Sequence, residues 1–165
     1  MIYIKGISHA SKDLQSARVA ERQSHSAQKV LASKYKIPIS IKSEYSDILS
    51  TGSGITLWAI FSKRNDDINE NSPIRIGSDN LGERGKKAEI VGEECALNLI
   101  KEISGNAPID KHLADQLLPY LPLLSGSKMK VSQITPHFLT NVYTIKQFLG
   151  KKFNVDEKER IIEAL

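Results

Sequence analysis

His137 is the residue best placed to do chemistry, because it stands at the start of a predicted helix. Thr135 suits the N-cap of that helix and Pro136 its first position, so the imidazole lies in the first turn. The positive end of the helix dipole disfavours a protonated ring and favours the neutral, nucleophilic form. The free N–H groups at the same end attract phosphate. A nucleophile for an anionic substrate is one interpretation, and a surface or hydrogen-bonding histidine is the other.

A second polar group lies in the segment 110–124. His112, Asp115, Gln116 and Pro119 recur at helical spacing and share one side of a predicted helix. These side chains suit a nucleotide or a divalent cation, although an exposed helix face explains the same spacing. The opposite, buried side of this helix is predicted to carry Leu113, Leu117, Leu121 and Leu124.

The segment 77–87 is rich in glycine and basic residues and precedes another predicted helix. Glycines in such a position let backbone N–H groups approach an anion. The spacing matches neither a P-loop nor a dinucleotide fingerprint, since Gly82 is followed by Glu83. We therefore interpret the segment as a strand-to-helix connector, with Arg84, Lys86 and Lys87 in solvent or weakly facing RNA.

The elements that must position these residues form two predicted units, 1–106 and 107–165, because Gly105, Asn106 and Pro108 interrupt the helical pattern. The first unit is predicted to contain an edge strand around Pro38 and a central strand around Trp58. Its strands are predicted at 2–7, 37–41, 54–62 and 73–77, its helices at 16–32 and 88–103, and a loop at 63–72.

The second unit is predicted to contain helices at 110–124 and 136–149, strands at 129–134 and 152–155, and a charged hairpin that leads into Ile161. These few predicted strands form too small a sheet to cover both helices of the unit. The unit is therefore expected to be part of a larger domain, and the fold class is mixed α/β, of the α+β type.

Composition limits the classes of protein to which the chain can belong. It has 165 residues, a net charge of +4 and 40% hydrophobic residues, as in ordinary globular domains. The single Cys95 cannot form an internal disulfide or a Cys-x-x-Cys redox motif, which favours the reducing cytoplasm. No apolar run predicts a signal peptide or a membrane span.

Three segments together resemble the C-terminal half of the RNA 3′-terminal phosphate cyclase family. They are Gly-Ser-Asp-Asn-Leu-Gly-Glu-Arg-Gly-Lys-Lys-Ala-Glu at 77–89, His-Leu-Ala-Asp-Gln-Leu at 112–117 and Pro-His-Phe-Leu-Thr-Asn at 136–141. Their order and approximate spacing are those of the family. The resemblance implies a small thioredoxin-like insert sheet with two helices, followed by part of a β-α-β-α-β-β repeat of the catalytic domain.

The resemblance also implies an activity. Members of the family use ATP and a divalent cation, Mg or Mn, to convert an RNA 3′-phosphate into a 2′,3′-cyclic phosphate through a covalent histidyl-AMP. His137 stands at the position of the nucleophile, and Asp115 and Gln116 stand where the family contacts the adenylate, so we expect this polar side to approach His137. His112 replaces a tyrosine of other members and is expected to stack on adenine, whereas Asn141 belongs to the nucleophile motif without an assigned role.

The part of the family that precedes this region, which supplies residues for the phosphates and the cation, has no counterpart in the chain. A separate chain that supplies the missing half is therefore an expected partner, beside RNA 3′-phosphate ends. The metal ligands stay unknown. The alternative function is that of a non-catalytic, cyclase-like RNA-binding or ribosome-assembly factor, or an inactive fragment; retention of His137 favours the enzyme.

Overall fold

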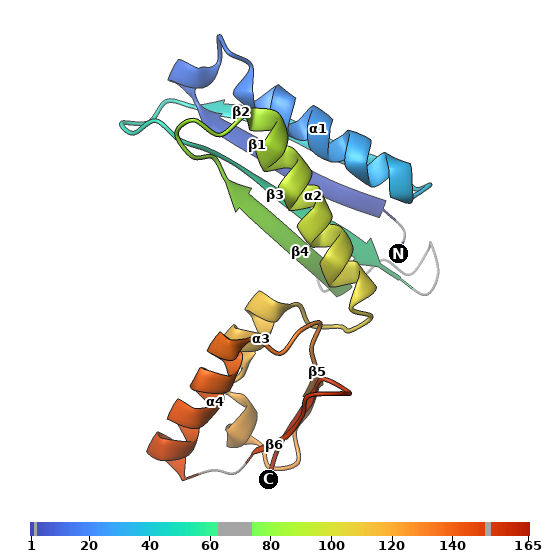
Figure 1. Cartoon of the computed structure of the whole chain (residues 1–165), viewed down its shortest axis with the longest axis vertical. Helices are drawn as coiled ribbons and strands as arrows, with labels where there is room; N and C mark the ends of the chain where they lie inside the picture. Colours follow the sequence, from blue (N-terminus) through green and yellow to red (C-terminus); the bar gives the residue numbers. More distant parts are fainter. Residues whose placement is uncertain (2, 63–73, 151–152) are drawn as a thin grey trace. The chain divides into compact units, whose positions relative to one another are not determined.

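The computed structural model describes residues 1, 3–62, 74–150 and 153–165, which divide into two units, Met1–Lys101 and Glu102–Leu165. Each unit has its own sheet and helices (Figure 1), and this confirms the predicted α+β class. The predicted loop at 63–72 and the first residues of the strands predicted at 2–7 and 152–155 lie outside the described residues. The domain boundary near residue 106 stays a prediction.

The first unit is built on a four-stranded sheet in the order β2-β1-β3-β4. Strands β1 and β2 are parallel, and β3 is antiparallel to both β1 and β4. A parallel pair needs a long crossover, which the helix α1 supplies. The order confirms the edge strand after Pro38 and the central strand that contains Trp58. The bounds are β1 Tyr3–Ser11, η1 Lys12–Leu14, α1 Val19–Lys34, β2 Ile39–Ser46, β3 Ser53–Phe61 and β4 Ile74–Leu81.

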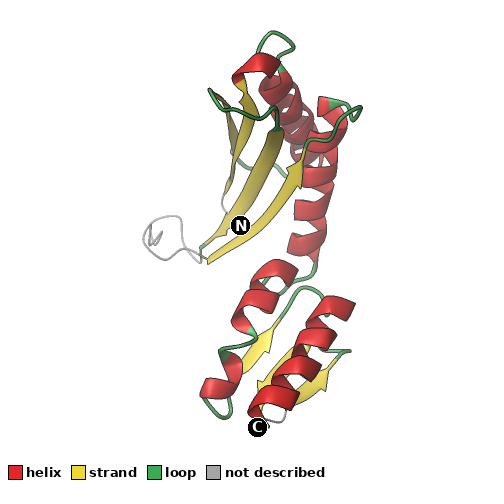
Figure 2. Cartoon of the chain, turned by 90° about the vertical axis from the view of Figure 1, so that its left-hand side faces the viewer, coloured by secondary structure: helices red, strands yellow, loops and turns green. Residues whose placement is uncertain are grey.

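Helices α1 and α2 (Ala88–Ser104) both cover the same face of this sheet (Figures 1 and 2). The core between them contains Ile4, Leu57 and Leu99, all fully buried. Cys95 is also buried in this core, with its Sγ 3.5 Å from the carbonyl oxygen of Ile55. Burial raises the pKa of this thiol to about 12, so Cys95 is a core residue rather than a reactive one.

The second unit consists of two helices beside a three-stranded antiparallel sheet in the order β5-β7-β6. An isolated parallel bridge joins Ile109 to Val131 just before the first of these helices. The bounds are α3 Lys111–Leu117, η2 Leu121–Leu123, β5 Lys128–Lys130, α4 Pro136–Leu149, β6 Phe153–Asp156 and β7 Ile161–Ala164. The buried core contains Ala114, Leu118, Met129, Val131, Phe138, Val142, Phe153, Ile162 and Ala164.

The helix predicted at 110–124 is wrong in both its length and its buried side. The α-helix ends at Leu117, because Pro119 and Pro122 have no N–H to continue the hydrogen-bond ladder. The core is contacted by Ala114 and Leu118, whereas the leucines predicted to be buried are largely outside it. Leu113 and Leu117 are 37% exposed and Leu124 is 71% exposed, while Leu121 packs partly against the core.

The strand predicted at 129–134 is also shorter than expected. Only Lys128–Lys130 pairs as a strand with β7; Val131 still donates its N–H to the carbonyl oxygen of Arg160 and also forms a bridge with Ile109. By contrast, the helix predicted at 136–149 is confirmed at both ends. Within the described residues, no helix combines the length and the apolar character that a membrane crossing requires.

Candidate active site

The N-terminus of α4 holds His137 in the position that the sequence predicts. The side chain of Thr135 caps the helix, with its Oγ1 accepting a hydrogen bond from the N–H of Phe138 at 3.0 Å. Pro136 occupies the first turn, and burial of Phe138 and Val142 fixes the helix against the core. The side chain of His137 is left 71% exposed, so a substrate can reach its ring.

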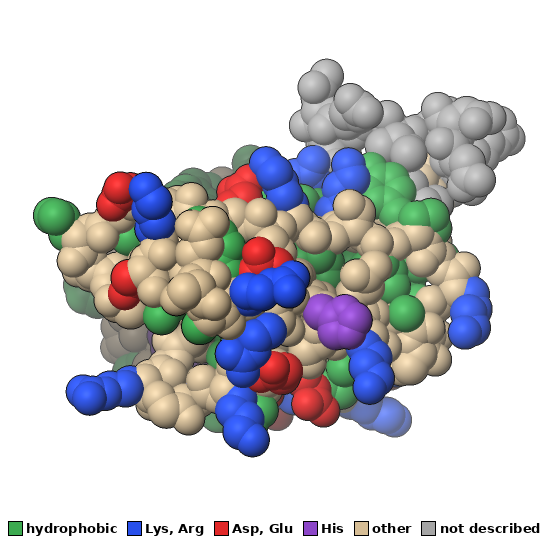
Figure 3. Space-filling model, turned by 90° about the horizontal axis from the view of Figure 1, so that it is seen from above, with side chains coloured by type: hydrophobic (Ala, Val, Ile, Leu, Met, Phe, Trp, Pro, Cys, Tyr) green, Lys and Arg blue, Asp and Glu red, His purple; other side chains and the backbone are tan. Residues whose placement is uncertain are grey.

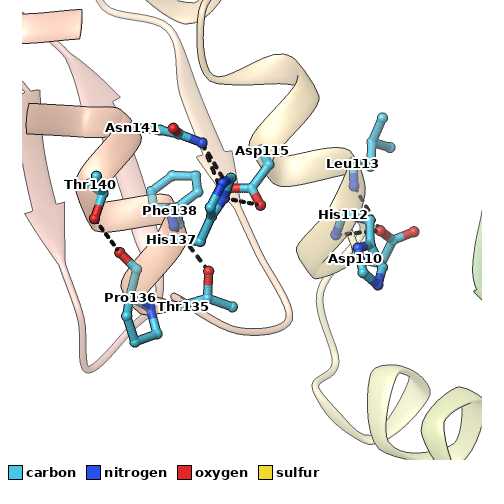
Figure 4. A network of polar contacts seen from close by, with 10 residues as sticks. All are labelled: Asp110, His112, Leu113, Asp115, Thr135, Pro136, His137, Phe138, Thr140 and Asn141. Atoms are coloured by element: carbon cyan, nitrogen blue, oxygen red, sulfur yellow. Dashed lines mark hydrogen bonds and ion pairs between the residues drawn. The ribbon is translucent and has the colours of Figure 1, made fainter. Parts of the chain in front are cut away.

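Asp115 comes from the neighbouring helix α3. The carboxylate of Asp110 starts this helix by accepting hydrogen bonds from the N–H groups of His112 and Leu113, at 2.9 and 2.8 Å. Asp115 follows one turn later and is only 24% exposed. Helices α3 and α4 lie side by side, and Figure 4 shows Asp115 and His137 pointing toward each other.

The contact between these two residues fixes the state of the imidazole. Nδ1 of His137 lies 2.9 Å from Oδ2 of Asp115. A carboxylate oxygen only accepts hydrogen bonds, so Nδ1 must carry the proton that joins the two atoms. In the neutral ring the lone pair is then on Nε2, which is the atom free to attack an electrophile. The carboxylate also orients the ring and stabilises positive charge that develops on it.

Asn141 completes the cluster from the next turn of α4. Its Nδ2 donates to Oδ1 of Asp115 at 3.5 Å and lies 3.3 Å from Nδ1 of His137 (Figure 4). Because Nδ1 carries a proton, the second distance is a close approach between two donors, and the carboxylate is the acceptor for both. The sequence places Asn141 in the motif without a role. The signal that reveals its position is its spacing of four residues from His137, which puts both on one face of α4.

The other two predicted ligands lie apart from this cluster. His112 and Gln116 are exposed on α3, and within the part of the chain that the structure describes neither side chain contacts His137. Figure 4 shows His112 near the start of α3, beside Asp110. The structure therefore brings Asp115, His137 and Asn141 together, and leaves His112 and Gln116 facing solvent.

The described residues offer no ready site for a metal ion. No group of three or more His, Cys, Asp or Glu side chains gathers closely enough among them to hold one. Asp115, the carboxylate nearest to His137, already accepts hydrogen bonds from two residues. A cation at this site would need ligands from elsewhere.

Comparison with known proteins identifies the fold of the first unit. Residues 2–104 match the model of the RNA 3′-terminal phosphate cyclase insert domain. The chain belongs to the RNA 3′-terminal phosphate cyclase family. Since the matched segment ends at residue 104, the residues of the candidate site lie beyond it.

Similarity to individual cyclases extends over both units. The chain is 42% identical to the RNA 3′-terminal phosphate cyclase of Pyrococcus abyssi over 153 residues, which are 93% of this chain and 41% of that protein. It is 42% identical to the cyclase of Sulfurisphaera tokodaii and 40% identical to that of Methanosarcina acetivorans, each over 99% of this chain. The chain thus spans 41–45% of the length of these relatives.

Proposed function

We propose that this chain carries the nucleophile of an ATP-dependent RNA 3′-terminal phosphate cyclase, a ligase of RNA processing in the cytoplasm. Nε2 of His137 attacks the α-phosphorus of ATP, an N–P bond forms, and pyrophosphate leaves with the electrons of the broken P–O bond. A 3′-phosphate oxygen of RNA then displaces the histidine and takes over the AMP. The neighbouring 2′-hydroxyl attacks the 3′-phosphorus, loses its proton and expels AMP, which closes the 2′,3′-cyclic phosphate.

The observation that carries this proposal is the contact between Nδ1 of His137 and Oδ2 of Asp115. In the neutral ring this contact leaves the lone pair on Nε2, and the 71% exposure of the side chain leaves that atom accessible. Attack on phosphorus places positive charge on the imidazole, and the Asp115 carboxylate stabilises that charge. The free N–H groups in the first turn of α4 favour an approaching phosphate.

The remaining predicted contacts belong to the same proposal. Gln116 and His112 are exposed on the helix that carries Asp115, where the amide can hydrogen-bond the adenylate and the imidazole can stack on adenine. The divalent cation does not fit the described residues, which contain no ligand cluster. It would come with the phosphates of ATP and be held by residues other than those that the structure describes, so no step here depends on it.

A partner is part of this function, because the second unit exposes apolar side chains on α3, η2 and α4. Buried residues such as Ala114 and Phe138 face the core, and nine large apolar residues on these elements and the turn between them are 37–84% exposed. A stable monomer seldom leaves so much apolar surface uncovered. We infer that the remainder of the cyclase, as the same polypeptide or a separate chain, covers this surface. These nine residues, here called the helix surface, are Leu113, Leu117, Tyr120, Leu123, Leu124, Leu139, Tyr143, Phe148 and Leu149.

The activity can be tested in a chimaera in which this chain replaces the matching region of the Pyrococcus abyssi cyclase. The chimaera is mixed with a divalent cation and ATP labelled at the α-phosphate, and acid-labile label on the protein is measured. We expect the chimaera to capture AMP and to cyclise an RNA with a 3′-phosphate. His137→Ala removes the attacking nitrogen and must abolish both, whereas His9→Ala, an exposed histidine on β1, must leave both intact.

Two outcomes contradict the proposal. Capture of AMP by the His137→Ala chimaera would assign the nucleophile to another residue. Binding of RNA without any capture of AMP by the unmodified chimaera would favour the non-catalytic, cyclase-like RNA-binding factor.

The helix surface has its own test in the same chimaera. Leu117→Ser with Tyr143→Ser places hydroxyls on this surface and should weaken its association with the rest of the enzyme, lowering the capture of AMP. The matched change is Leu97→Ser, on a 50% exposed leucine of α2 in the first unit, which should have no effect. Equal activity of all variants would show that the helix surface is not covered.

A further inference from the structure

The first unit contains a cavity that has no part in the chemistry of His137. It has a volume of about 650 Å³ and lies where η1, the turn before β3 and the connector between β4 and α2 meet. Small-molecule and nucleotide sites commonly occupy about 300–1,000 Å³. Figure 3 looks onto this end of the unit, over which Lys and Arg side chains are scattered.

The lining of this cavity combines an apolar wall with a basic rim. Leu14, Val19, Ala88 and Val91 supply the apolar side chains. The basic residues on its lining are Arg22, Arg84, Lys86 and Lys87, and the one acidic residue among the described lining residues is Glu83. An apolar wall beside cations suits a ligand with a planar apolar part and an anionic part.

Two of the four basic side chains on the lining form ion pairs with carboxylates, and the other two can contact a ligand. Arg22 makes a bidentate ion pair with Glu89, at 2.7 and 2.8 Å, and Nζ of Lys86 contacts Glu94. Arg84 and Lys87 are exposed, and within the described residues neither forms an ion pair. The pairs therefore hold the rim in place, and the two free cations can receive phosphate.

The backbone around the cavity is arranged in advance of any ligand. The N–H of Gly82 donates to the carbonyl oxygen of Ser53 at 2.8 Å, which ties the connector to the turn before β3. A Cβ at Gly82 would lie 2.1 Å from Oγ of Ser53, so a larger residue there would displace the Ser53 side chain. Gly85 has a φ of +83°, which turns the connector back toward α2. Binding of a ligand would therefore cost little backbone conformational entropy.

A second hollow of about 500 Å³ adjoins the first and shares Arg22 with it. Its other lining residues include the basic Arg18, the protonatable His25 and the acidic Glu21 and Glu89, the last of which is paired with Arg22. Two adjoining hollows with a common arginine exceed the needs of one mononucleotide. They suit a strand that places one phosphate at the unpaired cations of the first hollow and continues into the second.

We propose that this pair of hollows, here called the insert groove, binds single-stranded RNA, with one unpaired base against the apolar wall and its phosphate at Arg84 and Lys87. The proposal rests on the proposed function, since RNA is the substrate of that reaction. It assigns the insert unit the role of holding the strand. One nucleotide of an RNA strand and free AMP both offer a base and a phosphate to this groove. The experiment therefore distinguishes RNA from AMP.

The experiment measures the fluorescence anisotropy of a labelled ten-nucleotide RNA with the full chain, in the absence of ATP. Arg84→Ala with Lys87→Ala should lower the affinity about tenfold and reduce the dependence on salt by about one to two charges. Lys29→Ala with Lys36→Ala removes the same charge from exposed positions outside the groove and should have little effect. An equal loss of RNA affinity in the two double variants would overturn the proposal, because it would mean that the net charge of the chain alone attracts the RNA.

A third variant tests the cavity rather than its charge. Gly52 lines it, and a Cβ built there meets nothing within 4 Å, so Gly52→Phe adds a ring at the cavity without a clash at its Cβ. We expect weaker RNA binding with an unchanged salt dependence. Full RNA affinity in this variant would overturn the placement of the base. Displacement of the RNA by AMP at concentrations near its own dissociation constant would identify a mononucleotide site instead.

Failure of this proposal is distinguishable from failure of the proposed function. RNA binding is measured without ATP, and His137→Ala should leave it unchanged. Capture of AMP by the chimaera is measured without RNA, and the Arg84→Ala, Lys87→Ala variant should leave that unchanged. Loss of AMP capture in the groove variant would mean that these residues act in adenylation and would contradict their assignment to RNA.

Discussion

At the scale of single residues, the reactivity of His137 depends on which ring nitrogen carries the proton. A neutral histidine in water exchanges between two tautomers, and only the form protonated on Nδ1 offers the Nε2 lone pair. The Asp115 carboxylate selects that form through the 2.9 Å contact, and the hydrogen bond from Asn141 holds the carboxylate in place. Asp115 is thus a positioning residue, and its effect must pass through the ring.

Asp115→Asn tests this role with almost no change in volume. The amide can present either a donor or an acceptor to Nδ1, so the selection of tautomer is lost and AMP capture should fall by about ten- to a hundredfold. The measurements are single-turnover label capture and a thermal unfolding curve. A variant with normal stability and normal capture would remove Asp115 from the mechanism.

At the scale of elements, α1 and α2 approach each other so closely that no side chain fits between them at Gly92. A Cβ there would lie 2.1 Å from the carbonyl oxygen of Gln23 on α1. Small residues at this crossing, including the fully buried Ala20 and Ala96, let both helices lie on one face of the sheet. The crossing therefore sets the shape of the insert unit.

Gly92→Ala should destabilise the chain by about 1–3 kcal/mol, because the methyl group forces the helix backbones apart. This is the reverse of the gain of about 1 kcal/mol that alanine brings to an unconstrained helix position. Gly52→Ala, in open space, is the matched control and should change little. Denaturant unfolding measures both variants. A Gly92→Ala protein as stable as the original would contradict the close crossing.

The same two helices are joined by the Arg22–Glu89 ion pair, which predicts a pH dependence. Hydrogen bonds from Arg22 lower the pKa of Glu89 from 4.5 to about 2. A lowered folded-state pKa stabilises the fold above pH 4.5, and this contribution is lost as the pH falls from 4.5 toward 2. Because both side chains are nearly half exposed, screening limits the contribution to less than about 1 kcal/mol.

Glu89→Gln should therefore be slightly less stable than the original chain at pH 7, and the difference should vanish by about pH 2. Thermal unfolding at several pH values measures it, and added salt should reduce it at pH 7. A difference that grows on acidification would have the wrong sign for a carboxylate held in its charged form.

Sequence patterns predicted those elements whose signals are local. Helix α4 has a capping threonine, a first-turn proline and a terminal glycine, and its predicted bounds match the structure. The burial of Gln23 could not be predicted, because it depends on hydrogen bonds with Ser8 and Ser53, which are distant in sequence. Pairing with β2 as far as Ser46 likewise continues β1 through polar residues to Ser11. A helical wheel gives the polar side of α3, whereas the approach of Asp115 to His137 is expected only from the resemblance to the cyclase family, and the structure confirms that approach.

At the scale of the whole molecule, a buried polar network lies at the start of the second unit, Glu102–Leu165. Glu102 belongs to the second unit and is only 4% exposed. Its carboxylate accepts a hydrogen bond from Ser132 and lies 3.9 Å from Nζ of Lys111. Arg160 donates to the carbonyl oxygens of Gly105 and Ser132 in the same region. These contacts tie the first residues of the second unit to Ser132 and Arg160, which are distant in sequence.

Glu102→Ala should therefore destabilise the second unit and spare the first. The change leaves the buried Ser132 hydroxyl without its acceptor and Lys111 without its carboxylate, at a cost of about 1–3 kcal/mol. Hydrogen exchange of the full chain resolves the two cores: amides of β5, β6 and β7 should exchange about ten times faster for each 1.4 kcal/mol lost, and amides of β1–β4 should keep their rates. Glu93→Ala, at an exposed position of the same helix, should change neither set. If protection fell equally in both sheets, the chain would unfold as a single cooperative core, and the separation into an insert unit and a site-bearing unit would be wrong.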